Sequence, residues 1–167
     1  MLAAIAVTAP RLAAAGLDKD TSKFLGKIAT EVSALVDGSD LAATRTPFVE
    51  VRHFAEKAKK ELKKVRGALT DVASQAGVPA LAVANVEEHQ EILDDVREET
   101  DEDFEQAYVE TVVNVLEDMI ERFSEAVEDA DVLAVQTFAA DHLSKLRQLH
   151  ERAQMLDDRL DEITDRG

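Results

Sequence analysis

One Glu-x-x-His pair is the pattern in this sequence that could do metal chemistry: Glu50 and His53. Helical bundles that hold two metal ions place such a pair on each of two helices and add a Glu from each of two others. No second pair exists, because the residues three positions before the remaining histidines are Val86, Ala139 and Arg147. With 35 acidic residues and four histidines, one match is close to the number expected by chance.

Metal or redox chemistry therefore stands as an alternative hypothesis, which needs carboxylates and imidazoles from several helices. His142 lies within an apolar stripe, where a packed and hydrogen-bonded imidazole is the more common arrangement. His150 follows two turns later but about 80° around the helix, so the two rings share a face only loosely. The candidate ligands of this alternative are Glu31, Glu50, His53, Glu61, His142 and His150.

Composition excludes several other classes of chemistry. The chain has no Cys, which excludes disulfides, thiolate zinc sites and cysteine nucleophiles. A Gly-flanked nucleophile turn and a phosphate-binding glycine loop are both missing. The net charge of −16 repels phosphate backbones, so nucleic acid is not an expected partner. The sequence therefore predicts a protein that is not an enzyme and needs no cofactor.

The elements that would position these residues are helices. Apolar residues make up 46% of the 167 residues, with only 6 Gly and 3 Pro, and they recur at three- and four-residue spacing. The spacing predicts a first helix from Asp20 or Thr21, with a bend or frayed turn at Asp37–Asp40 because those residues prefer turns. Thr46-Pro47 ends this helix and starts the second, which runs to about Ala76, before Gly77.

The second half of the chain predicts a short helix over Val86–Glu98 and two long ones within Asp103–Ile163. The joint at Glu128–Asp131 is short, which makes the last two helices neighbours that run in opposite directions. No strand pattern occurs. The expected fold class is all-α, an antiparallel four-helix bundle with a short extra helix before the third long helix. The last helix is expected to face inward as far as Ile163.

The second helix carries a basic side opposite its apolar stripe. Cations in such a run are most often solvated or paired with carboxylates of neighbouring helices. Docking of a partner protein is the alternative interpretation. The residues of this basic side are Lys57, Lys59, Lys60, Lys63, Lys64 and Arg66.

Residues 1–16 are interpreted as an export-signal remnant or a short Ala-rich helix. They contain a short apolar run and a small-residue end, but no leading positive charge, and Pro10-Arg11 interrupts the run. The run is too short to span a bilayer, and no transmembrane segment is expected elsewhere. Residues 17–167 are expected to form a single bundle domain.

Several runs resemble, in order and spacing, a bacterial family of unknown function: the domain of unknown function family 4142, or "predicted outer membrane protein". The clearest element is Phe104-x-x-Ala107-Tyr108-Val109, accompanied by runs at Val51–Ala55 and Phe138–Leu146, within a similarity that covers Phe24–Leu156. The resemblance implies a secreted protein with a ferritin-like helical bundle.

The resemblance also implies a metal site, with a glutamate on the first helix and a histidine on each later long helix. The aligned positions here are Leu35, Leu62, Leu116 and Leu149. A leucine layer is physically reasonable, because a dry core avoids burying charges without an ion. We therefore expect a metal-free, structural or partner-binding protein of the periplasm or cell envelope, or otherwise of the cytoplasm. Its partner would be another protein or a second copy of itself.

Overall fold

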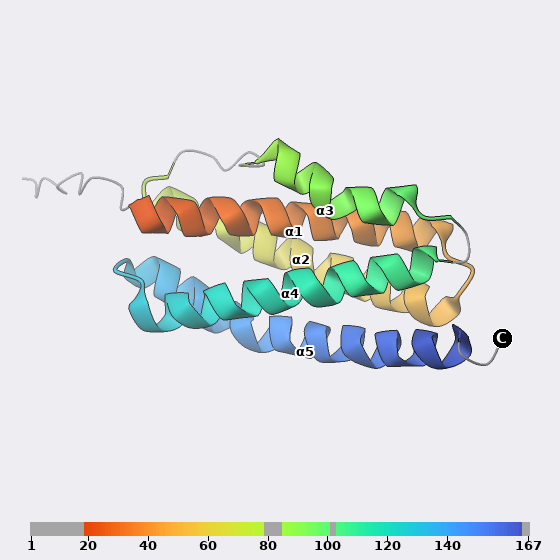
Figure 1. The fold of residues 1–167 in the computed structure, drawn as a ribbon. Helices are drawn as coiled ribbons and strands as arrows, with labels where there is room; N and C mark the ends of the chain where they lie inside the picture. The colour runs from red at the N-terminus through yellow and green to blue at the C-terminus, as the bar shows by residue number, and fades with distance from the viewer. Residues whose placement is uncertain (1–18, 79–84, 101–102, 165–167) are drawn as a thin grey trace, which may run out of the picture.

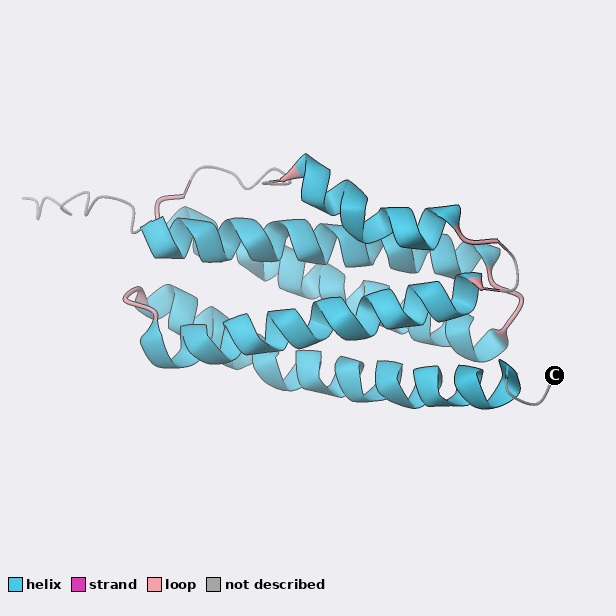
Figure 2. Cartoon of the chain, viewed as in Figure 1, coloured by secondary structure: helices cyan, strands magenta, loops and turns pink. Residues whose placement is uncertain are grey.

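The computed structural model describes residues 19–78, 85–100 and 103–164, which form five helices and no strand in these ranges (Figure 2). They are α1 (Lys19–Arg45), α2 (Val49–Gln75), α3 (Val86–Glu98), α4 (Phe104–Asp129) and α5 (Leu133–Thr164). The all-α prediction and the bounds predicted for the short helix are confirmed. The segment 1–16 lies outside the described residues. Within the described ranges, no helix is both long and apolar enough to cross a membrane.

The four long helices lie side by side, and α3 lies along α1 (Figure 1). The most extensive pairings join α1 with α2 and α4 with α5. Each of these pairs is connected by a loop of three residues, 46–48 and 130–132. Such short connections bring consecutive helices together as neighbours. The short helix α3 contacts both α1 and α4, so it fixes one half of the structure to the other.

The predicted interruption of the first helix at Asp37–Asp40 is wrong, because α1 continues through these residues. Gly38 and Ser39 are buried there. A Cβ at Gly38 would lie 3.3 Å from Leu93 Cδ2, so glycine allows α3 to approach closely. The Ser39 hydroxyl is 3.0 Å from the Tyr108 hydroxyl, which satisfies both groups inside the core. Tertiary packing therefore overrides the local preference for a turn.

The apolar stripes of all five helices meet in a continuous core. Val51, Leu62 and Leu69 of α2 are at most 2% exposed, as their spacing predicts. The prediction for Ile163 is wrong, because its side chain is 57% exposed in the last turn of α5. Leu160, one turn earlier, is buried, with 8% of its side chain exposed.

The end of α2 follows the predicted glycine signal. Gly77 has a φ of 74°, a left-handed conformation in which a Cβ is strained. Its N–H donates to the Ser74 carbonyl at 3.2 Å, and the Val78 N–H donates to the Ala73 carbonyl at 2.9 Å. These two bonds form a Schellman motif, which satisfies carbonyl groups at the end of the helix.

Two glycines of α2 and its cap offer a matched test of this backbone argument. A Cβ at Gly67 or at Gly77 meets no atom within 4 Å, so alanine substitutions differ in backbone conformation alone. Gly67→Ala is expected to stabilise the fold by about 1 kcal/mol, because alanine is the better helix former. Gly77→Ala is expected to destabilise it by about 1 kcal/mol, because of its positive φ. Urea unfolding of both variants measures this, and changes of the same sign would contradict the assigned conformations.

Candidate functional site

The six candidate ligands of the metal alternative lie apart. The carboxylate of Glu50 pairs with Arg159 at 3.0 Å, and that of Glu61 pairs with Lys64 at 2.9 Å. His53 is exposed on α2. Within residues 19–78, 85–100 and 103–164, no three His, Asp or Glu side chains gather in a group that could hold a metal ion.

The two histidines of α5 differ in their surroundings. The His142 ring packs against Phe138, with 5.1 Å between the ring centroids. Burial lowers the pKa of His142, while the neighbouring Asp141 carboxylate raises it to a smaller extent. Nε2 of His150 is buried and has no hydrogen-bond partner among the described residues. The two imidazole rings therefore lie in different surroundings, and nothing in those surroundings directs both rings at one ion.

The four leucines at the aligned metal positions are all buried. Leu35 is 2%, Leu62 0%, Leu116 0% and Leu149 3% exposed. Each comes from a different long helix, and all belong to the same apolar core. The centre of the helices is therefore apolar at these positions, where a charged ligand without an ion would cost several kcal/mol.

Glu31 is a buried acid that lies beside two cations. It is 2% exposed on α1. Its Oε1 accepts a hydrogen bond from Arg122 Nη1 of α4 at 2.8 Å and lies 3.6 Å from Lys27 Nζ. Its Oε2 is buried and has no partner among the described residues. Burial raises the pKa of Glu31 from its ordinary 4.5 to about 7, against the opposing effect of Arg122 and Lys27.

The ion pairs continue from Glu31 into two further helices. Lys27 also pairs with Glu88 at the start of α3. Arg122 Nη2 lies 3.6 Å from Asp118 Oδ2, one turn earlier on α4. A single chain of charges therefore joins α3, α1 and α4, and Glu31 is its buried centre.

The start of α3 is fixed beside this chain. Asn85 caps the helix by accepting a hydrogen bond from the Glu88 N–H at 3.2 Å. The Asn85 N–H donates to Thr30 Oγ1 at 3.2 Å, and that hydroxyl donates to the Gly26 carbonyl at 3.1 Å. The N-terminus of α3 is thereby hydrogen-bonded to α1.

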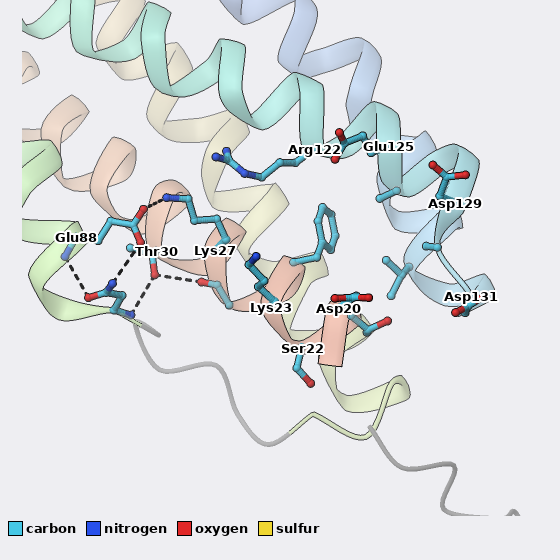
Figure 3. Close-up of a pocket in the computed structure, with 17 residues that line it drawn as sticks. Asp20, Ser22, Lys23, Lys27, Thr30, Glu88, Arg122, Glu125, Asp129 and Asp131 are labelled. Carbon is cyan, nitrogen blue, oxygen red and sulfur yellow. Dashed lines mark hydrogen bonds and ion pairs between the residues drawn. The ribbon is translucent and has the colours of Figure 1, made fainter. Parts of the chain in front are cut away.

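A cleft of about 790 Å³ opens where these elements meet (Figure 3). Its volume is within the range of ligand-binding pockets. The walls come from the starts of α1 and α3, the end of α4 and the start of α5. We call this the end cleft. Its charged lining residues are Asp20, Lys23, Lys27, Glu88, Arg122, Glu125, Asp129 and Asp131, and its apolar ones are Phe24, Ala126, Ala130 and Val135.

Four of the charged residues that line the end cleft lie toward its opposite ends (Figure 3). Lys27 and Arg122 lie at the inner end beside α3, and Asp129 and Asp131 lie at the opposite, outer end, with Glu125 between them. In the described part of the chain, Glu125, Asp129 and Asp131 form no hydrogen bond or ion pair. They follow one another at the end of α4, whose last turn has no basic residue. Carboxylates there face the negative end of the helix dipole, which is unfavourable.

Sequence reasoning missed the end cleft. From the sequence, Glu31 is a candidate metal ligand, and Glu128–Asp131 is a joint between two helices. A usable signal was present, because acids are favoured in the first turn of a helix and disfavoured in the last. Glu125 and Asp129 break that preference. The basic partners Lys27 and Arg122 are 95 positions apart, so their meeting depends on the tertiary fold.

The basic side of α2 is only partly neutralised. Lys59 pairs with Asp40 of α1, which confirms the predicted pairing with a neighbouring helix for this residue. This contact lowers the pKa of Asp40. The largest cause is the hydrogen bond from Lys59, followed by the positive charge of Lys59. Four further cations form no ion pair with any described residue, and these are Lys57, Lys60, Lys63 and Arg66.

A protein-family profile described as "Domain of unknown function (DUF4142)" matches residues 6–156. The matched range contains the whole lining of the end cleft and the Phe104–Val109 element. No curated protein matches the chain significantly, and no solved structure does.

The raised pKa of Glu31 makes stability depend on pH. Below about pH 4.5 the carboxyl is protonated in both the folded and the unfolded chain, and the ionised form costs free energy only in the folded state. The contribution of Glu31 to the free energy of unfolding is therefore greatest at low pH. It falls by about 3 kcal/mol as the pH rises from below 4.5 to above 7.

Subtracting the unfolding free energies of a Glu31→Gln variant from those of the wild type, between pH 4.5 and 8.5, isolates this contribution. The difference is expected to shift against the wild type with rising pH. A difference that stays constant, or that shifts in favour of the wild type, would contradict the pKa assigned to Glu31. Glu117→Gln, an exposed change on α4, serves as the control and is expected to leave the profile unchanged.

Proposed function

We propose that this chain, which belongs to the family of the domain of unknown function DUF4142, is a non-enzymatic binding protein of the bacterial cell envelope. Its helices would form an antiparallel, ferritin-like four-helix bundle that carries no metal. The bundle would act as a scaffold, and the end cleft would bind a partner protein.

The apolar centre of the helices supports a role without a metal. A buried metal site needs several charged ligands directed at one point, and their charges are costly to bury without the ion. The four leucines at the aligned positions instead pack in the core, at most 3% exposed. The hypothesis of a metal or redox bundle gains no support from Glu50 and Glu61, since arginine and lysine side chains already pair with them.

The end cleft is the observation on which the binding proposal rests. It combines a volume of about 790 Å³ and apolar surface with carboxylates that have no cationic partner among the described residues. Binding sites typically combine apolar walls with a few polar groups that orient the partner. Charges that lower helix stability are also expected where a ligand must be recognised.

Metal analysis tests the first half of the proposal. Purified protein incubated with Fe²⁺, Cu²⁺, Zn²⁺ or Mn²⁺ and then desalted is expected to retain far less than one ion per chain. Retention of one ion per chain would contradict the proposal. A Glu50→Gln/His53→Ala variant would then show whether the single Glu-x-x-His pair is responsible.

Photocrosslinking in living cells of the source bacterium tests the second half. A photoreactive amino acid at position 125, in the end cleft, is expected to give one discrete protein adduct in the envelope fraction. The same amino acid at position 117 is the matched control, because Glu117 is an exposed glutamate of the same helix outside the cleft. Equal adducts from both positions, no adduct at 125, or recovery of the protein in the cytosol would contradict the proposal.

A further inference from the structure

The geometry of the end cleft points to a partner of stated chemistry. We infer that it takes the C-terminal tail of the partner protein, with the terminal carboxylate between Lys23, Lys27 and Arg122 and a Lys or Arg side chain, three residues earlier, against Asp129 and Asp131. This inference rests on the proposed function and names the segment that the cleft recognises.

The distance between the two charged ends supports a ligand of this length. Arg122 and Asp129 are seven positions apart on α4, and Asp20 and Lys27 are seven positions apart on α1. At 1.5 Å per residue, each interval is about 10 Å along its helix. An extended peptide spans about 3.3–3.6 Å per residue, so three residues cover the same distance. Figure 3 shows Lys27 and Arg122 toward one end of the cleft, and Asp129 and Asp131 toward the other.

The cations at the inner end differ in how many acids they face among the described residues. Lys23 forms no ion pair with any described residue, whereas Lys27 is shared by Glu31 and Glu88. Arg122 is shared by Glu31 and Asp118. A ligand carboxylate would place a third acid beside Glu31, whose pKa is already raised to about 7. Binding should therefore be accompanied by protonation of Glu31, which frees Lys27 and Arg122 from one of the two carboxylates that each of them faces.

The outer end has the opposite imbalance. Glu125, Asp129 and Asp131 line the cleft, and within the described ranges none of them has a cationic partner. The negative end of the α4 dipole adds to their field. A Lys or Arg side chain of the ligand would be attracted by both. The apolar residues Ala126 and Val135 line the cleft with them, and Ala126 leaves room for the backbone of the ligand.

Isothermal titration calorimetry with the full chain and a short probe peptide tests the inference. The probe is acetyl-Lys-Ala-Ala-Ala with a free carboxylate, and two altered probes carry a C-terminal amide or Glu in place of Lys. Each alteration is expected to weaken binding at least tenfold, through the loss of one charge pair. Titrations at pH 7 in buffers of different ionisation enthalpy are expected to show proton uptake, which Glu31→Gln abolishes.

Two exposed cleft residues provide variants that should leave the fold intact. Lys23→Gln is expected to weaken the free-acid probe about tenfold and to leave the affinity for the amide unchanged. Asp129→Asn is expected to weaken the lysine probe and not the Glu-substituted one. The matched controls outside the cleft are Lys60→Gln and Glu117→Gln, which should change neither affinity.

The outcomes separate this inference from the proposed function. No binding at millimolar peptide, or equal affinity for the free acid and the amide, would overturn the inference, while a crosslinked adduct at position 125 would still support a binding protein. Peptide binding with the expected pattern but no adduct in cells would support the ligand chemistry and contradict the partner protein.

Discussion

The buried carboxyl of Glu31 is the interaction on which the arrangement of α1, α3 and α4 depends. An acid that is 2% exposed is costly to ionise, and Arg122 and Lys27 offset part of that cost. Their alkyl stems must therefore reach from the cleft wall into the core, with their charged groups held at a fixed depth. The same contacts extend to the first turn of α3, since Lys27 also pairs with Glu88. The positions of Lys27 and Arg122 at the inner end of the cleft therefore follow from the buried carboxyl of Glu31.

The leucine positions show the contrasting solution to the same problem. Leu35 lies one turn after Glu31 on α1 and is 2% exposed, with no charge to compensate. An apolar layer in the middle of the helices stabilises them through burial alone, at about 25 cal/mol per Å². The charges around Glu31 extend to the end cleft at Lys27 and Arg122, where solvent reduces the desolvation penalty.

Sequence reasoning predicted the helices well because their apolar spacing is regular and their ends carry clear signals. Gly77 ended α2 as expected, and the short helix began at Val86. It failed at Asp37–Asp40, where the turn preference of Gly38 and Ser39 was outweighed by contacts with Leu93 and the Tyr108 hydroxyl. Both contacts join residues more than 50 positions apart. The end cleft was missed for the same reason, because local periodicity carries no information on which charges will meet.

The acids at the end of α4 are unfavourable for the helix itself, although the protein folds with them in place. Helix stability alone would favour a Lys or Arg near position 129, yet Glu125 and Asp129 occupy the last turns, and Asp131 follows in the loop. Each such charge costs a few tenths of a kcal/mol at an exposed helix end. The burial of an extensive apolar core offsets that cost, so the acids need not stabilise the fold. Local rules are broken most often at functional sites, because a bound group supplies the missing charge. A cation placed there by a ligand would satisfy the carboxylates and the helix dipole together, which makes the end of α4 the part of this surface most able to select its partner.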